Sequence, residues 1–430
     1  MTYQEAVTYL FESAPLFQNI GAGAYKEGLE NTHLLDAHFG HPHRYFRTIH
    51  VAGTNGKGSV SHTLAALLQA AGYRTGLYTS PHLVDFRERI RVNGEMIPEQ
   101  RVLDFVERER DFFEPLHPSF FELATALAFK YFEEAQVDVA VIEVGMGGRL
   151  DCTNIIRPDL SIITNISFDH VQFLGNTLSQ IATEKAGIMK SSIPVVIGET
   201  NGHTDVRQIF LRKACEVGTK VVFADEMGEI LSAIPNNEGG MTYLTLHHGT
   251  FEAQLGGLCQ RANTATILAA VDELKRMGYA IKDEQIWQGF QHVCDFTGLM
   301  GRWQKLCDDP DVICDTGHNV AGFQYIVQQL ARQCHKQLHI IIGMVSDKDV
   351  STILTLLPIN ASYYFTQASV KRAMPADKFA AKATEAGLKG QTYENVATAY
   401  HAALKNAAPE DLIFVGGSNF IVADMLKSIL

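Results

Sequence analysis

The stretch His50-Val51-Ala52-Gly53-Thr54-Asn55-Gly56-Lys57-Gly58-Ser59 decides the fold, because it joins an extended run over residues 45–50 to the start of a helix. Its three glycines let the backbone turn tightly, so that successive N–H groups point at an anion held on the helix N-terminus. Lys57 adds a positive charge, and the Ser59 hydroxyl suits a phosphate-bound Mg²⁺. The strict Walker pattern fails, because Gly58 follows the lysine and Val51 occupies the upstream glycine position. A glycine turn without bound ligand is the alternative interpretation of this stretch alone.

Length and composition predict a soluble globular protein of two or three domains. The chain has 430 residues, of which 46% are hydrophobic and 20% charged, and its mean hydropathy is −0.02. A chain of this length exceeds the size at which a single core stops growing. It contains no uncharged apolar run of membrane-spanning length, and Met1-Thr2-Tyr3-Gln4-Glu5 lacks the basic start of a signal peptide. We therefore expect a cytoplasmic protein with no membrane partner.

The net charge and the cysteine pattern argue against a nucleic-acid-binding protein and against a disulfide-bonded or zinc-binding one. A net charge of −12 and a pI near 5.8 argue against a nucleic-acid partner, which needs a dense basic surface. Any anionic ligand must therefore be held locally, by a loop, a metal ion or a few cations. The seven cysteines include no C-x-x-C pair, which favours reduced, packed thiols over disulfides or a zinc site.

Three polar side chains stand at the ends of predicted strands. Ser80 follows the extended run 75–79, Glu143 lies near the end of the continuous apolar run 139–145, and His170 follows the apolar run 160–166. Open α/β sheets place ligands at the carboxyl ends of their strands. A buried carboxylate is costly unless it is paired or metal-bound, so a metal-facing Glu143 is favoured over a structural one. For His170, a ligand role and a structural role are equally supported by the sequence.

Local helix signals favour capping roles for two other residues. Ser119 to Glu122 forms a capping box before an amphipathic helix, so capping is the better interpretation of Glu122. Asn263, in the first turn of a helix predicted over 261–277, is more often a cap than a ligand. The run 241–255 reads as a β-hairpin. Gly28-Leu29-Glu30 alone indicates only a loop before a helix.

The break in periodicity at residues 294–301 is the predicted domain boundary. The fold class is α/β, with a P-loop-type ATPase domain containing a mostly parallel sheet over residues 1–296. Residues 297–430 alternate strand and helix and predict a smaller Rossmann-like domain. The stretch from Asp315 to Asn319 follows its first strand. No G-x-G-x-x-G follows that strand, which argues against a dinucleotide cofactor.

Seven stretches together resemble the folylpolyglutamate synthase/dihydrofolate synthase family of the Mur ligase superfamily. They occur in family order and comprise His50 to Ser59, Thr79 to Leu83, Glu143 to Asp151, Asp169-His170 with Leu174-Gly175, Glu184 to Ile188, Gly301-Arg302, and Asp315 to Asn319. Only about fifty residues precede the glycine loop, whereas the Mur ligases of cell-wall synthesis usually carry a substrate domain there. The chain departs from the family at three places. The family often has a basic residue where this chain has Asn31, and alanine where it has Cys152. It often has a Gly-Ala pair where this chain has Thr316-Gly317.

The resemblance implies a complete set of site residues, with ATP and Mg²⁺ as cofactors. The implied ATP-binding residues are Gly53, Thr54, Asn55, Gly56, Lys57, Gly58, Ser59, Asn263, Arg302, Asp315 and His318. The implied metal-site residues are Ser59, Ser80, Glu143, His170 and Lys185, and the implied catalytic residues are Lys57, His170 and Lys185. The implied pterin-side residues are Gly28, Leu29, Glu30, Phe121, Glu122, Thr125, Leu150, Asp151 and Cys152. The resemblance further implies that Lys185 is carbamylated, whereas without it a surface lysine pairing with Glu184 or solvent is favoured.

The implied reaction adds L-glutamate to dihydropteroate, to the γ-carboxylate of folates, or to both, through an acyl phosphate. Sharing of the ATP site by two domains would imply closure on binding and exclusion of water. We expect a monomer. Two alternatives stay open: a Mur-type ligase acting on another carboxylic acid, and a nucleotide-dependent switch or binding protein, which would not need Glu143, His170 and Lys185 together.

Overall fold

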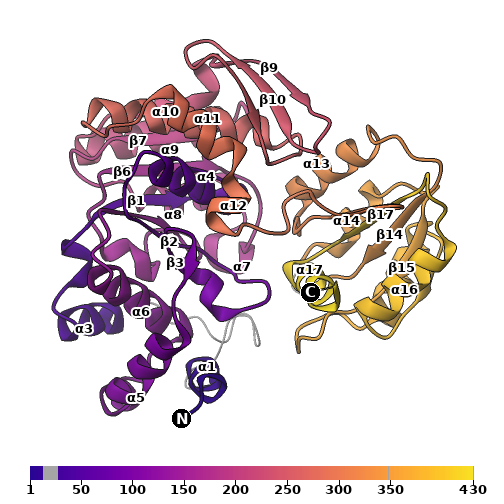
Figure 1. Ribbon diagram of the computed structural model, residues 1–430, viewed down its shortest axis with the longest axis horizontal. Helices are drawn as coiled ribbons and strands as arrows, with labels where there is room; N and C mark the ends of the chain where they lie inside the picture. The colour runs from indigo at the N-terminus through magenta and orange to yellow at the C-terminus, as the bar shows by residue number, and fades with distance from the viewer. Residues whose placement is uncertain (13–27, 347, 430) are drawn as a thin grey trace. The chain divides into compact units, whose positions relative to one another are not determined.

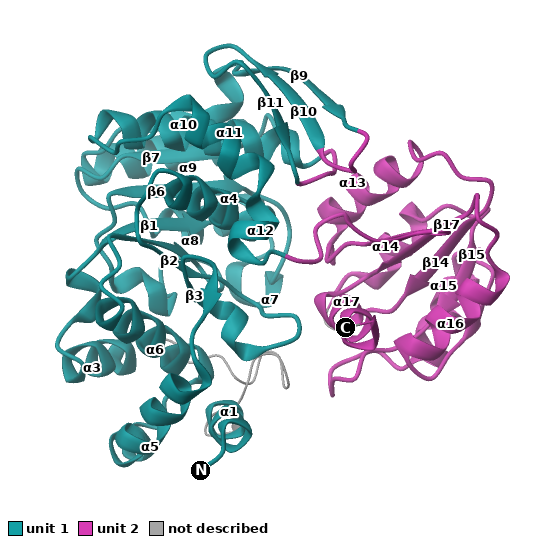
Figure 2. Ribbon diagram, viewed as in Figure 1, with its two compact units in different colours: residues 1–236, 241–254, 259–299 teal, residues 237–240, 255–258, 300–430 magenta. Residues whose placement is uncertain are grey.

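The computed structural model of the protein describes residues 1–12, 28–346 and 348–429 and divides into two compact units (Figures 1 and 2). The first unit comprises Met1–Asn236, Met241–Gln254 and Cys259–Leu299. The second comprises Asn237–Gly240, Leu255–Leu258 and Met300–Leu430. The long C-terminal segment thus begins at Met300, and two short segments from the middle of the chain group with it.

An eight-stranded sheet forms the centre of the first unit, with strand order β4-β3-β2-β5-β1-β6-β7-β8. Strands β2, β5, β1, β6, β7 and β8 run parallel, whereas β3 and β4 are antiparallel to their neighbours. All five residues of β5 are buried, as the continuous apolar run predicts for a central strand. The strands are β1 Arg47–Ala52, β2 Thr75–Tyr78, β3 Ile90–Val92, β4 Glu95–Met96, β5 Val139–Glu143, β6 Leu160–Asn165, β7 Val195–Glu199 and β8 Val221–Phe223.

Helices cover both faces of this sheet. One core packs α4, α10 and α11 against Ile49, Val51 and their neighbours, and another packs α1, α5 and α6 against Ala140 and Ile142. The α-helices are α1 Tyr3–Glu12, α3 Glu30–His38, α4 Lys57–Ala70, α5 Glu99–Leu116, α6 Phe120–Glu134, α7 Val171–Leu174, α8 Leu178–Ala186, α9 Thr204–Val217, α10 Gln260–Arg276, α11 Asp283–Gln291 and α12 Val293–Thr297. The short 3₁₀ helices are η2 Pro42–Arg44, η3 Phe86–Arg89, η4 Cys152–Ile155 and η5 Ala224–Glu226.

A small antiparallel sheet extends this unit, with β9 Ile230–Pro235, β10 Met241–Thr245 and β11 Thr250–Ala253 in the order β11-β10-β9. Tyr243 pairs with Phe251, so the predicted hairpin over residues 241–255 is confirmed. The turn between β9 and β10 is the segment Asn237–Gly240 that groups with the second unit.

The second unit contains a six-stranded sheet of order β12-β13-β17-β14-β15-β16, parallel except for β12. The strands are β12 Gln304–Asp308, β13 Asp311–Cys314, β14 Leu338–Ile342, β15 Ser362–Phe365, β16 Gly390–Thr392 and β17 Leu412–Gly416. The helices are α13 Val320–Leu330, α14 Val350–Leu356, α15 Ala376–Glu385, α16 Val396–Asn406 and α17 Asn419–Ile429. Both units have the predicted α/β architecture. Among the described residues, no helix combines the length and apolar character needed to cross a membrane.

Candidate active site

The glycine loop between β1 and α4 has a conformation that requires glycine. Gly53 and Gly56 have φ angles of 143° and 85°, a region that other residues rarely adopt. A Cβ atom at Gly53 would collide with the Thr164 side chain on β6, and one at Gly56 would collide with the Asn263 amide on α10. The loop therefore lies closely packed between β6 and α10.

Hydrogen bonds from β6 and the residues after it hold the loop in place. The Thr54 and Asn55 backbone N–H groups donate to the Asn165 backbone and side-chain oxygens at 3.0 and 2.9 Å. The Thr164 hydroxyl donates to the Asn55 carbonyl at 2.6 Å. The Lys57 ammonium folds back over the loop and donates to the Gly53 and Thr54 carbonyls, each at 3.1 Å. The loop is thus held rigidly, as an anion site at a helix N-terminus requires.

Asn263 contacts the loop and does not cap its helix. The N-cap of α10 is Cys259, so the capping interpretation of Asn263 is wrong. Its side-chain NH₂ donates to Gln260 Oε1 at 2.9 Å, and the Gln260 NH₂ lies 3.4 Å from the Ser59 hydroxyl. Gln260 is therefore a further residue of the loop's surroundings, in addition to those predicted from the sequence. Its signal was a polar residue one helical turn before Asn263, on the same helix face.

Three of the predicted metal ligands lie at or after the carboxyl ends of the parallel strands β2, β5 and β6. Glu143, 3% exposed at the end of β5, accepts a hydrogen bond from the Ser80 backbone N–H at 3.1 Å. His170 has a φ of 49° directly before α7, and its Nε2 lies 3.9 Å from Asp169 Oδ2. The structure thus brings Ser80 and Glu143 together, and it places the His170 imidazole close to the Asp169 carboxylate.

The donor chemistry of this set fits a hard cation, because a carboxylate, a hydroxyl and an imidazole are available. Among the described residues, no group of three or more His, Cys, Asp or Glu side chains is arranged to hold a metal ion. The predicted set has a different composition, because it combines one carboxylate and one imidazole with serine hydroxyls and a lysine.

Lys185 on α8 is buried at the phosphate loop. Its side chain is 3% exposed, and its Nζ donates to the Gly53 carbonyl at 2.8 Å. Burial and the nearby Lys57 charge lower the pKa of Lys185 to about 7. The surface-lysine interpretation is therefore wrong, and Glu184 forms an ion pair with Arg149 at 3.0 Å.

Three predicted substrate segments meet where α3, α6 and η4 pack against one another. Gly28 and Leu29 precede α3, which begins at Glu30; Phe121, Glu122 and Thr125 lie on α6; Leu150 and Asp151 precede η4, which begins at Cys152. Residues separated by more than one hundred positions in the chain are thereby gathered on one side of the sheet.

On α6, the polar side chains Glu122 and Thr125 form hydrogen bonds within the protein, whereas the Phe121 ring remains partly exposed. The Glu122 carboxylate accepts from the Ser119 N–H at 2.5 Å and the Ser119 hydroxyl accepts from the Glu122 N–H, so the predicted capping box is confirmed. The Thr125 hydroxyl lies 3.1 Å from the Tyr78 hydroxyl. The Phe121 ring is half-buried over Gly145, where a Cβ would collide with the ring. Phe121 therefore offers an aromatic surface beside the end of β5.

Asp151 organises the turn into η4. Its Oδ1 accepts from the Thr153 N–H at 3.0 Å and its Oδ2 from the Met146 N–H at 2.9 Å. Burial nevertheless raises the pKa of Asp151. Burial and the Asp151 charge raise the pKa of Cys152 well above its ordinary value, so this side chain remains a thiol.

In the second unit, Asp315 follows β13 and closes a turn. Its two carboxylate oxygens accept from the Gly317 N–H at 2.7 Å and the Trp303 N–H at 2.8 Å, and burial raises its pKa. The nearby Arg302 charge opposes that rise. His318 Nδ1 lies 3.1 Å from the Thr316 carbonyl. Arg302, Asp315 and His318 thus gather near the carboxyl end of β13.

Family models match both units of the chain. The Mur ligase middle domain matches residues 51–271, and the Mur ligase glutamate ligase domain matches residues 301–419. The chain therefore belongs to the Mur ligase family, whose fold and phosphate loop are those described above. Within it, the relatives define a particular branch.

The chain is 32% identical over 417 residues to the dihydrofolate synthase/folylpolyglutamate synthase of Escherichia coli, covering 96% of this chain and 93% of that protein. It is 31% identical to the folylpolyglutamate synthase of Lacticaseibacillus casei, covering 100% and 99%. The structure of Mycobacterium tuberculosis folylpolyglutamate synthase with ADP is 30% identical with a TM-score of 0.87, covering 99% and 97%. E. coli FolC in complex with DHPP and ADP is 30% identical with a TM-score of 0.84, covering 100% and 98%.

These relatives confirm the family resemblance and the predicted class of enzyme, an ATP-dependent acid–amino-acid ligase acting on dihydropteroate or folate and L-glutamate. A related structure, 28% identical with a TM-score of 0.83 over 100% of this chain and 98% of that one, contains Mn, AMPPNP and L-glutamate. Use of ATP with a divalent metal ion is therefore also confirmed.

Proposed function

We propose that this protein joins L-glutamate to a dihydropteroate or folate carboxylate, with the loop from Gly53 to Ser59 holding the phosphates of ATP. The observation that carries this assignment is the contact of two lysines, Lys57 and Lys185, with the Gly53 carbonyl inside a rigid glycine loop. Asn263 and Gln260 support the loop from α10. We further propose that Arg302, Asp315 and His318 bind the same nucleotide.

The chemical problem is to bring an anionic carboxylate to the γ-phosphate. Two unit charges at 4 Å repel by about 4 kcal/mol at an effective dielectric near 20. Lys57 offsets part of this repulsion, and it lies close enough to the loop to do so. A Mg²⁺ ion would supply further positive charge to the phosphates, and the residues that would hold it are Ser59, Ser80, Glu143 and His170.

The reaction then proceeds in two steps. A carboxylate oxygen of the acceptor attacks the γ-phosphorus, and the bond to the β-γ bridging oxygen breaks to give an acyl phosphate and ADP. The glutamate amine attacks the activated carbonyl carbon, loses a proton and expels inorganic phosphate. Loop N–H groups and Lys57 stabilise the charge that develops on the transferred phosphoryl group.

Lys185 is proposed to act as a carbamate. Its neutral amine, available because the pKa is about 7, attacks CO₂; an N–C bond forms and a proton leaves to solvent. The carbamate nitrogen keeps one hydrogen, which can still donate to the Gly53 carbonyl. Its oxygens carry negative charge suited to a hard cation, unlike an ammonium group.

We propose that the acceptor binds where α3, α6 and η4 meet. Phe121 presents an aromatic ring to the flat pterin, and Cys152 contributes a neutral thiol beside it. Glu122 and Asp151 hold the surrounding backbone through hydrogen bonds. We propose that the enzyme is cytoplasmic. We also propose that it is a monomer, which sedimentation of the purified protein would test.

One assay tests the activity: ADP release with L-glutamate present, measured separately with dihydropteroate and with tetrahydrofolate. We expect ADP release that requires both glutamate and at least one acceptor. ADP release without glutamate would support a nucleotide switch. No turnover with either acceptor, but turnover with another carboxylic acid, would support a different Mur-type ligase.

A further inference from the structure

A buried hydrogen bond connects the phosphate-loop helix to the end of the first unit. His62, on the helix α4 that begins at Lys57, has its Nδ1 2.8 Å from the hydroxyl of Thr297, the last residue of α12. The two side chains are 6% and 0% exposed. Thr297 is followed by Gly298 and Leu299, after which the chain enters the second unit.

The direction of this hydrogen bond follows from the neighbouring groups. The Thr297 hydroxyl has one hydrogen, which it donates to the Val293 carbonyl at 2.5 Å. It can therefore only accept from His62, so Nδ1 of His62 carries the proton. Serine at position 297 can preserve both hydrogen bonds, whereas the isosteric valine can form neither.

A second set of contacts holds the same segment from the β3–β4 turn. Gly298 has a φ of 64°, and a Cβ there would lie 2.9 Å from the guanidinium of Arg91. Arg91 in turn donates to the Gly94 carbonyl at 2.8 Å, and Gly94 packs against the Phe296 backbone. The start of the linker is thus fixed between α4 and the β3–β4 turn.

We propose that His62 and Thr297 are positioning residues that fix the start of the linker relative to the phosphate loop. Neither side chain is assigned to the nucleotide or the acceptor. Their hydrogen bond sets where the chain leaves the first unit, and therefore where Arg302, a few residues later, is tethered. This inference rests on the proposed role of Arg302 in ATP binding, because only then does the tether affect catalysis.

The test uses full-length Thr297→Val, Thr297→Ser and the double variant His62→Leu/Thr297→Val. Thr297→Val removes the hydroxyl that accepts from the His62 Nδ1–H group, and the double variant removes both side chains of this hydrogen bond. We expect kcat/KM for ATP to fall about tenfold or more in Thr297→Val and in the double variant, since displacements of about 1 Å can cost roughly a hundredfold. KM for the acceptor should not change, and Thr297→Ser should resemble wild type.

Thr75→Val is the matched control, because Thr75 is also buried and its hydroxyl donates to the Tyr73 carbonyl at the amino end of β2. It should keep wild-type kcat/KM for ATP. A double variant with thermal stability, kcat and KM equal to wild type would overturn the proposal, as would an equal loss in Thr75→Val. Failure of the proposed function is distinguishable, because wild type itself would then show no glutamate-dependent ADP release.

Discussion

Lys57 and Lys185 share one acceptor: their Nζ atoms lie 3.1 and 2.8 Å from the carbonyl oxygen of Gly53. The two lysines come from different helices, α4 and α8, and meet only because both helices reach the carboxyl edge of the sheet. Burial lowers the pKa of Lys185, and repulsion from the Lys57 ammonium on the same carbonyl lowers it further. This pairing places the Lys185 amine, whose pKa is lowered, next to the Lys57 side chain.

Lys57→Ala should abolish amide formation without unfolding the protein. Lys57 is half-buried at the loop and belongs to no apolar core. Removing a single preorganised hydrogen-bond donor that stabilises transition-state charge already costs roughly 10²–10³ in kcat, and Lys57 carries such a donor. ADP release gives the rate and thermal melting the stability. Ser59→Ala should also abolish turnover, and normal turnover of Lys57→Ala at saturating ATP would contradict the proposed role.

Lys185→Ala should lose activity, and short carboxylates such as acetate should restore part of it. Because the lysine reacts with CO₂ only as a neutral amine, activity should rise as the pH increases through about 7 and should fall in CO₂-free buffer. A metal-loaded crystal of active enzyme should show three additional heavy atoms on Nζ. Clear density for an unmodified amine in such a crystal would rule out the carbamate.

The lowered pKa of Lys185 also predicts the direction in which the unfolding free energy changes with pH. An unfolded lysine has a pKa near 10.4, so between about pH 7 and that value the unfolded chain binds a proton that the folded chain does not. Stability from this group should therefore rise with pH across that window. Urea unfolding of wild type and Lys185→Met at pH 7 and 9 measures it; identical pH dependence would contradict the lowered pKa.

Gly56→Ala should weaken ATP binding through crowding. The residue has a φ of 85°, and a Cβ would collide with the Asn263 amide. Gly40→Ala is the matched control, because Gly40 has a φ of 74° with nothing near its Cβ position. Both variants incur about 1–2 kcal/mol of backbone strain. Only Gly56→Ala should raise KM for ATP; equal ATP kinetics in the two variants would show that the close packing is unimportant.

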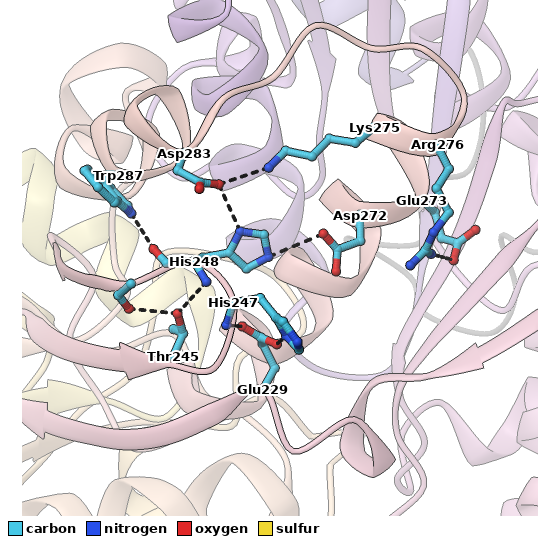
Figure 3. A network of polar contacts seen from close by, with 11 residues as sticks. Glu229, Thr245, His247, His248, Asp272, Glu273, Lys275, Arg276, Asp283 and Trp287 are labelled. Atoms are coloured by element: carbon cyan, nitrogen blue, oxygen red, sulfur yellow. Dashed lines mark hydrogen bonds and ion pairs between the residues drawn. The ribbon is translucent and has the colours of Figure 1, made fainter.

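His248, in the β10–β11 turn, is a buried imidazole between two carboxylates (Figure 3). Its Nδ1 lies 3.2 Å from Asp283 and its Nε2 3.4 Å from Asp272, and Lys275 also contacts Asp283. Burial acts to lower the pKa of His248, but the interactions with Asp272 and Asp283 outweigh it and raise the pKa. Carboxylates on both nitrogens favour the doubly protonated ring.

Because the folded pKa is raised, His248 stabilises the fold fully below its unfolded pKa of about 6.5 and loses that contribution as pH rises through the folded value. We expect the unfolding free energy to contain a contribution from His248 that is present at pH 6 and declines as the pH rises through the raised pKa of the folded state. His248→Gln should remove this decline. The exposed neighbour His247, which contacts Glu229, provides the control variant His247→Gln.

The local features were predictable because they depend on short-range backbone preferences. Three features depend only on the conformation of a few neighbouring residues: the glycines at 53 and 56, the buried run of β5, and the capping box of Ser119 and Glu122. The alternation of strands and helices then predicts two α/β units. Family-ordered motifs add the class of reaction, which the relatives confirm.

Contacts between distant segments were decided only by the tertiary structure. The sequence alone favours Lys185 as a surface residue and Asn263 as a cap, yet both side chains contact the phosphate loop, from α8 and α10. The His62–Thr297 hydrogen bond gives no recognisable pattern in the sequence, and Gln260 can be found only through its helical spacing from Asn263. The physical reason is that parallel strands bring their carboxyl ends to one edge whatever their separation in the chain, so side chains with ordinary local surroundings become neighbours there.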